Sequence, residues 1–144
     1  MSDEPFFLDT NILVYARDSR DANKQRVAAE LIERAISSGQ GRISVQVLEE
    51  FYRTVTGKLS PGIPRKDARK AVKALEVLRP APIDGELLEA AWTVEDSAKL
   101  SWWDALIVAA ASRERCLILY SEDLSHGMRI GSVEVRNPFR RAAE

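Results

Sequence analysis

Hydrophobic and polar residues along this chain alternate in blocks that predict strands and helices in turn. The apolar stretch at residues 6–9 (FFLD) predicts a short strand that runs directly into a helical turn, with Thr10 or Asn11 as its cap. Apolar side chains recur at helical spacing through residues 21–38, and Gly39 predicts the end of that helix. The chain therefore changes from strand to helix at its first acidic residue within an apolar block, Asp9.

The later blocks continue this alternation. Short strands are expected at residues 42–45 (RISV), 79–84 (RPAPID), 117–121 (LILYS) and 133–137 (VEVRN). Helices are expected over residues 46–58, over the basic stretch after the loop LSPGIP, and over residues 85–100 and 102–115. Strands that alternate with helices favour a parallel sheet covered by helices on both faces. We find no repeat or linker, and expect a single α/β domain over residues 1–144.

Composition narrows the class of protein. With 144 residues, 45% of them hydrophobic, the chain can bury the core of one ordinary domain. The N-terminus has no basic region followed by a long apolar run, and no apolar stretch is long enough to cross a bilayer, so we expect a cytoplasmic protein with no membrane contact. The single cysteine, Cys116, excludes an internal disulfide and a cysteine-based zinc site, and its apolar neighbours predict a core position.

The net charge of −1 conceals an uneven distribution. The segment Arg53–Arg79 carries a charge of +6 and the remainder of the chain −7. Such a segment, with Arg17 and Arg20, could hold a polyanion such as RNA. The simpler interpretation is the solvated face of a helix, which is the commoner case. Likewise the paired tryptophans 102 and 103 could stack on bases, although aromatic residues at a helix start more often pack in a core or a dimer interface.

Acidic residues occur at positions where parallel sheets commonly form their ligand-binding sites. Asp9 and Asp123 each follow a predicted strand, while Asp104 and either Glu49 or Glu50 lie early in predicted helices. Ligands bind at the carboxyl ends of parallel strands, so these acids are expected to converge. Clustered carboxylates repel one another unless a cation neutralises them, and oxygen ligands favour Mg²⁺ or Mn²⁺.

Each acid also has a purely structural explanation. Asp104 follows Ser101 in the Ser-x-x-acid pattern of a capped helix start. Asp9 can cap a turn, Asp123 can form a turn by accepting from its own backbone, and the two glutamates can be an exposed polar pair. Taken singly, these explanations are the stronger ones, and only the joint placement of the acids favours a metal site.

Four motifs in the chain resemble those of the PIN-domain family, and especially its VapC-like toxin branch. In order, they are DTNIL, ISVQVLEEFYRTVT, LSWWDALIVAAA and ILYSEDLSHG, and together they span nearly the whole chain. The resemblance implies a three-layer α/β/α fold with a short central parallel sheet, a homodimer, divalent-metal ribonuclease activity and an antitoxin partner.

The resemblance also implies roles for particular residues. Helix phase places Glu49 nearer the apolar face than Glu50, and the acid of the SED motif is either Glu122 or Asp123, so these choices are open on the residues alone. The family pattern favours Glu50 and Asp123. It assigns the metal-binding acids to Asp9, Glu50, Asp104 and Asp123, and the accompanying small polar residues to Thr10, Asn11 and Ser121.

The resulting hypothesis is a Mg²⁺- or Mn²⁺-dependent endoribonuclease in which the four acids hold one or two ions, acting as the toxin of a type II toxin–antitoxin pair. The only histidine, His126, excludes transesterification by two histidines without a metal. A receiver-like signalling module would need a lysine after LILYS, and a haloacid-dehalogenase-like phosphatase would need an aspartate at Asn11. A PIN-like RNA-processing nuclease outside the toxin branch and a non-catalytic dimeric binding protein are the remaining alternatives.

Overall fold

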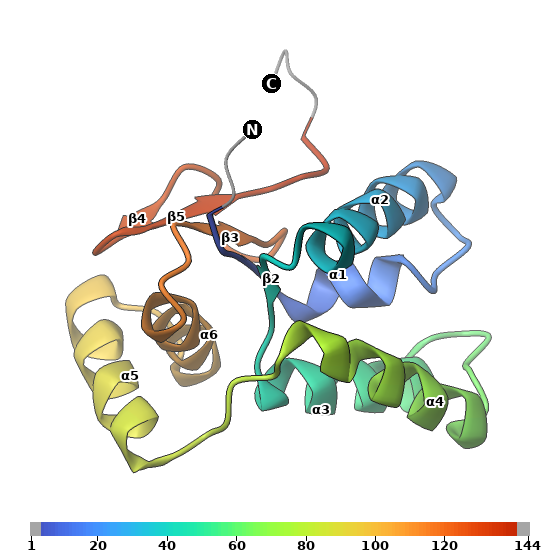
Figure 1. Cartoon of the computed structure of the whole chain (residues 1–144), viewed down its shortest axis with the longest axis horizontal. Coiled ribbons are helices and arrows are strands. Elements are labelled where there is room, and N and C mark those ends of the chain that lie inside the picture. The colour runs from blue at the N-terminus through green and yellow to red at the C-terminus, as the bar shows by residue number, and fades with distance from the viewer. Residues whose placement is uncertain (1–3, 141–144) are drawn as a thin grey trace.

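A five-stranded sheet forms the centre of the molecule in the computed structural model, which describes residues 4–140 (Figure 1). The strands lie in the order β2, β1, β3, β5, β4, and all neighbouring pairs are parallel except β4 with β5. Their bounds are β1 Phe6–Leu8, β2 Gly41–Arg42, β3 Ile118–Tyr120, β4 Arg129–Ile130 and β5 Val133–Arg136. The predicted parallel sheet is therefore confirmed, and the short antiparallel strand β4 is an addition to it.

Helices cover both faces of this sheet (Figure 1). Helix α6 packs on β3 and β5 with α5 beside it, while α2 packs against β2 and α1 packs against α2 and α3. The helices are α1 Thr10–Tyr15, α2 Ala22–Ser38, α3 Val45–Arg53, α4 Arg65–Leu75, α5 Gly85–Ala98 and α6 Trp102–Arg113, with a π-helical turn η1 at Thr54–Lys58 and a 3₁₀ turn η2 at Glu76–Leu78. This is the expected three-layer α/β/α arrangement.

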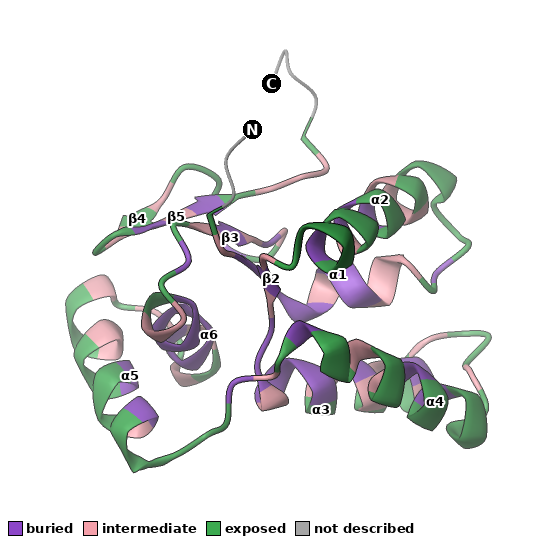
Figure 2. Ribbon diagram, in the orientation of Figure 1, coloured by how far each residue is buried: buried purple, intermediate pink, exposed green. Residues whose placement is uncertain are grey.

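The core lies between the sheet and these helices. Phe7 and Leu119 from neighbouring strands are fully buried, and α6 is buried over Ala105–Ala111 (Figure 2). Burying one such large apolar side chain contributes about 1.5–3 kcal/mol. Cys116 is also in the core, as predicted, and burial raises the pKa of its thiol to about 12. Within residues 4–140, no helix has the length and apolar character that a bilayer crossing requires.

Local signals predicted several helix ends correctly. Helix α2 ends at Gly39, which takes a φ of 71° that favours glycine. At the start of α6, the Ser101 hydroxyl accepts a hydrogen bond from the Asp104 backbone N–H at 3.2 Å, so the predicted cap is present. Another glycine, Gly41, is required by packing, because a Cβ atom there would lie 2.2 Å from the Cβ of Ala35.

The structure decides between the caps that the sequence offered for α1. The cap is Asp9, whose carboxylate accepts from the Thr10 backbone N–H, rather than Thr10 or Asn11. Asp9 still has the extended backbone of β1, so it is the residue that flanks the helix, while Thr10 and Asn11 are already helical. Strand and helix therefore meet at this acid without an intervening loop.

Two predicted strands are shorter than expected. Residues 79–84 form only an isolated bridge between Ala81 and Ser44, because the prolines on both sides of Ala81 have no N–H to donate. In the predicted strand 42–45, the strand ends at Arg42, and Ser44 instead caps α3 by accepting from the Val47 backbone N–H at 3.3 Å. Helix α3 therefore starts early enough to place Glu50 in its second turn.

Candidate active site

Asp9 is buried at the carboxyl end of β1, with 5% of its surface exposed. Its carboxylate accepts from the Thr10 backbone N–H and from the Ser121 hydroxyl, both at 2.7 Å. Burial raises the pKa of Asp9 from 3.8 to about 6; the two hydrogen bonds oppose this rise, and the charges of Asp123 and Glu50 add to it. The site therefore contains a desolvated carboxylate with two other acids close enough to perturb it.

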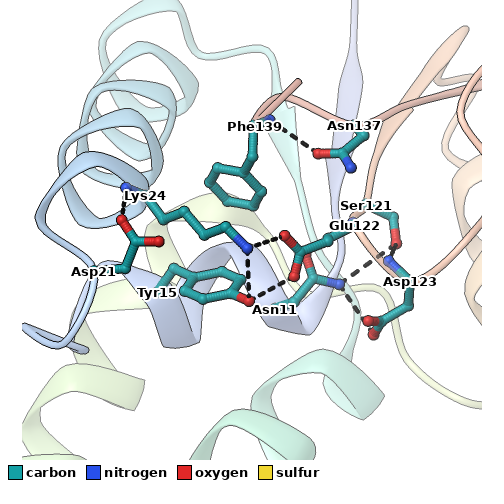
Figure 3. Close-up of polar contacts among 9 residues, drawn as sticks. All are labelled: Asn11, Tyr15, Asp21, Lys24, Ser121, Glu122, Asp123, Asn137 and Phe139. Carbon is teal, nitrogen blue, oxygen red and sulfur yellow. Dashed lines mark hydrogen bonds and ion pairs between the residues drawn. The ribbon is translucent and has the colours of Figure 1, made fainter. Parts of the chain in front are cut away.

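Asn11 joins the ends of two neighbouring strands. From the first turn of α1, its side-chain N–H donates to the Asp123 carboxylate at 3.2 Å, and the same nitrogen lies 3.4 Å from oxygens of Asp9 and Ser121. Its carbonyl oxygen accepts from the Glu122 backbone N–H at 3.1 Å (Figure 3). Because β1 and β3 are parallel neighbours, these predicted residues lie together at one edge of the sheet, as their positions after the strands indicated.

Glu50 reaches the same place from α3. One carboxylate oxygen accepts from the Thr10 hydroxyl at 2.7 Å, and the other accepts from the Gln46 side-chain amide at 3.0 Å. Gln46 is 3% exposed and also donates to the Trp103 carbonyl oxygen at 3.1 Å, so it links α3 to α6. The sequence reading did not single out Gln46, although its position one helical turn before Glu50 was a signal that they share a face.

The structure separates the two pairs of acids that the sequence left open. Glu49 is exposed and Glu50 is half-buried. The reason is that Val47 lies at the centre of the buried face of α3, and the helix-phase prediction had not included it in that face. In the SED motif, the Asp123 carboxylate accepts from the Asn11 amide, whereas the Glu122 carboxylate accepts from Tyr15 and Lys24 (Figure 3). Glu50 and Asp123 are therefore the members of each pair that lie with Asp9.

Asp104 completes the set from the first turn of α6. Its side chain is half-buried, and burial raises its pKa, a hydrogen bond with Ser101 lowers it, and the charges of Asp123 and Glu50 raise it further. The acid thus belongs both to the capped start of the helix and to the group of mutually repelling carboxylates. Asp9, Glu50, Asp104 and Asp123 are therefore brought into one region, and Glu49 and Glu122 are not part of this group.

A surface hollow of about 520 Å³ is bordered by Glu50 and Asp123, while Asp9 and Asp104 do not line it, and we call it the acidic hollow. It is lined by Thr10, Asn11, Val14, Gln46, Glu49, Glu50, Arg53, Thr54, Lys58, Trp103 and Asp123. Of the basic segment, Arg53 and Lys58 border the hollow, whereas Arg17 lies on a different groove and Arg20 pairs with Asp18. The indole of Trp103 is 63% exposed at the rim, while Trp102 packs against the core.

Comparison with known proteins identifies the family. The PIN domain model matches residues 6–126, a range that contains every one of the acids described above. The chain belongs to the PIN domain family. The resemblance drawn from the four motifs is thereby confirmed, and the α/β/α sheet of this PIN domain agrees with it.

Solved structures share the fold of this PIN domain at low sequence identity. A toxin–antitoxin complex from Klebsiella pneumoniae has a TM-score of 0.69 and 21% identity, over 94% of this chain and 98% of that one. VapBC2 from Rickettsia felis, bound to a DNA fragment from its promoter, has a TM-score of 0.64 and 18% identity, over 92% of this chain and 97% of that one. The sarcin-ricin loop cleaving toxin VapC20 from Mycobacterium tuberculosis has a TM-score of 0.62 and 22% identity, over 82% of this chain and 89% of that one. Comparison with curated proteins gave no match.

The side chains of this PIN domain fit a divalent cation in their chemistry. Among residues 4–140, none of the ion pairs involves Asp9, Glu50, Asp104 or Asp123, so no cationic side chain neutralises these acids directly. Within the same residues, no three side chains of His, Cys, Asp or Glu form a ready-made metal cage. Mg²⁺ commonly keeps several waters and binds one or two carboxylates together with a substrate phosphate, which suits an open acidic site of this kind.

Proposed function

We propose that this PIN domain is a metal-dependent ribonuclease that hydrolyses RNA phosphodiester bonds with Mg²⁺ or Mn²⁺ as its cofactor. The observation that carries the proposal is the convergence on one region of carboxylates from the ends of β1 and β3 and from α3 and α6, with no cationic partner among residues 4–140. Holding like charges together is unfavourable in a structural site, whereas a bound cation makes it favourable.

Each residue of the site has a defined task in this proposal. Asp9, Glu50, Asp104 and Asp123 would hold one or two ions, which when bound supply Lewis-acid stabilisation of the phosphate and an activated water. The hydrogen bonds of the neighbouring polar side chains fix where each carboxylate points, since the hydroxyl of Thr10 orients Glu50 and the amide of Asn11 orients Asp123.

The rim of the acidic hollow offers groups that suit an RNA strand. Arg53 and Lys58 provide positive charge for the phosphate backbone, next to carboxylates that would otherwise repel it. The exposed indole of Trp103 provides a flat apolar surface on which an unpaired base stacks. Positive charge and an aromatic face around an acidic centre favour a single-stranded substrate over a base-paired one.

We further propose that the protein is the toxin of a toxin–antitoxin pair, acting in the cytoplasm as a homodimer with a cognate antitoxin. The support is the shared fold with the Klebsiella pneumoniae and Rickettsia felis complexes and with the cleaving toxin VapC20, together with the four sequence motifs.

Cleavage of a pool of structured RNAs tests the nuclease. Purified protein without antitoxin is incubated with Mg²⁺, Mn²⁺ or EDTA, beside Asp104→Asn and the control Asp96→Asn, which alters an exposed acid on α5. We expect metal-dependent cleavage that is lost in Asp104→Asn and kept in Asp96→Asn, with both variants folded. Equal cleavage by wild type and Asp104→Asn would remove Asp104 from the site, and absence of both cleavage and metal binding would favour a non-catalytic protein.

A further inference from the structure

Neighbouring side chains of the Ser121 to Asp123 segment have different partners (Figure 3). Asp123 is directed to Asn11, whereas Glu122 is directed to α1 and α2. The Glu122 carboxylate accepts from the Tyr15 hydroxyl and from the Lys24 ammonium group, each at 2.5 Å. The Lys24 ammonium group also donates to the Tyr15 oxygen at 3.3 Å. We call Tyr15, Lys24 and Glu122 the Lys24 cluster.

The position of Lys24 is unfavourable without this partner. It lies in the first turn of α2, where its backbone N–H donates to the cap residue Asp21, and a cation at a helix N-terminus is opposed by the helix dipole. Cation–π contacts with the rings of Tyr15 and Phe139, whose centroids lie 4.7 and 5.5 Å from the ammonium group, favour the cation here and help to hold it beside Glu122. Its side chain is 29% exposed, so the ion pair with Glu122 is only partly screened by water.

The C-terminal segment covers the cluster and reaches the far end of the same loop. The ring of Phe139 packs edge-to-face on Tyr15, with centroids 5.0 Å apart. The Asn137 side chain accepts from the Phe139 backbone N–H at 2.9 Å, and the Asn137 backbone N–H donates to His126 Nδ1 at 3.0 Å. The loop that follows β3 is therefore attached at Glu122 and again at His126, so it is held on both sides of Asp123.

Asp123 needs such support. It is exposed, it follows the last residue of β3 by three positions, and Asp9 and Asp104 repel it. A free loop would relieve the repulsion by moving the carboxylate towards solvent. Among residues 4–140, the Asp123 carboxylate accepts one side-chain hydrogen bond, from the Asn11 amide at 3.2 Å, and water competes for it because Asp123 is exposed.

We propose that Lys24 is a positioning residue that holds Asp123 in place for the cation by fixing the neighbouring Glu122. The inference rests on the proposed metal-dependent function. Lys24 does not touch the cation in this account; it acts through the backbone that Glu122 and Asp123 share. The same ion pair keeps the Glu122 carboxylate directed away from the acidic hollow.

Mn²⁺ affinity, measured by the loss of the free Mn²⁺ signal in electron paramagnetic resonance, tests this without reference to cleavage. The proteins are wild type, Lys24→Met, Lys24→Arg and the control Arg26→Met, which removes an exposed cation from the same helix. Loss of a neighbouring positive charge by itself strengthens cation binding. Positioning predicts the opposite sign for Lys24→Met, an affinity lower by about ten-fold, as found for partners that orient metal ligands.

Lys24→Arg keeps a cation for Glu122 and is expected to restore most of the affinity, while Arg26→Met is expected to bind Mn²⁺ as wild type or slightly better. If Lys24→Met does not fold, Lys24→Gln replaces it, because it also removes the positive charge and carries the same expected loss. Wild-type or tighter binding by the folded variant overturns the role of Lys24 and leaves the proposed function standing. A wild-type protein that binds no Mn²⁺ overturns both proposals.

Discussion

Replacing the buried acid of the site should stabilise the metal-free protein at high pH. The folded pKa of Asp9 is about 6, compared with 3.8 for an ordinary aspartate, because the ionised carboxylate is desolvated. This difference in pKa corresponds to about 3 kcal/mol of unfolding free energy. The protein with Asp9 ionised is less stable by that amount than the protein with Asp9 protonated. Asp9→Asn has the same shape without the charge, and its amide oxygen can still accept from the Thr10 N–H.

The sign of the pH dependence follows from the direction of the shift. The carboxyl group of Asp9 binds its proton more tightly in the folded protein than in the unfolded chain. The stability that protonated Asp9 contributes is therefore fully present below pH 3.8 and is lost as the pH rises through about 6. Between pH 8 and pH 5, wild type should therefore regain roughly half of the 3 kcal/mol. Asp9→Asn has no titrating group at this position and should not regain it.

Urea unfolding in EDTA, at pH 8 and pH 5, measures this directly. The quantity to compare is the change in unfolding free energy between the two pH values, because the other titrating groups are common to both proteins and cancel. Added Mn²⁺ at pH 8 should stabilise wild type more than Asp9→Asn. Identical pH dependence in the two proteins would show that the Asp9 carboxylate does not pay a desolvation cost, and the reasoning would be refuted.

Three further predictions concern packing and RNA binding. Gly41→Ala should destabilise the fold by about 1–3 kcal/mol or more in urea unfolding, because the new Cβ would lie 2.7 Å from the backbone Cα of Ala35. Trp103→Ala should weaken the binding of a labelled single-stranded RNA in EDTA by about 1–3 kcal/mol, with unchanged thermal unfolding. An unaltered affinity would show that the indole is not a base-stacking surface. The double variant Arg53→Gln, Lys58→Gln should reduce the slope of log affinity against log salt concentration by roughly 1–2 in the same titration. An unchanged slope would show that the RNA phosphates bind elsewhere.

Much of the fold and the placement of the acids could be predicted because the decisive signals are local or topological. Ser101 and Gly39 mark helix ends through hydrogen bonding and backbone conformation that neighbouring residues specify. Asp9 and Asp123 converge because parallel strands that lie side by side must end at the same edge. Convergence in space is what the structure adds to these positions, while the roles of the acids in metal binding and catalysis are what the proposed experiments test.

Other features depended on tertiary contacts that periodicity does not contain. Helix phase favoured Glu49, but the side chain that reaches Thr10 is that of Glu50, because α3 turns its Val47 face inward against the rest of the fold. Strand β4 is a two-residue element that exists only through its pairing with β5. The contacts of Gln46 and Lys24 were missed because each joins elements far apart in the sequence.

Both outer strands of the sheet are short, and this limits how other chains can attach. The edge strands β2 and β4 each have two residues, Gly41–Arg42 and Arg129–Ile130. An extended segment of another protein would find too little free backbone at either edge to add a strand, which also protects the sheet against edge-to-edge aggregation. A protein that binds this domain must therefore recognise side chains on its helices and loops, so mutations on those surfaces can change the choice of partner without disturbing the sheet.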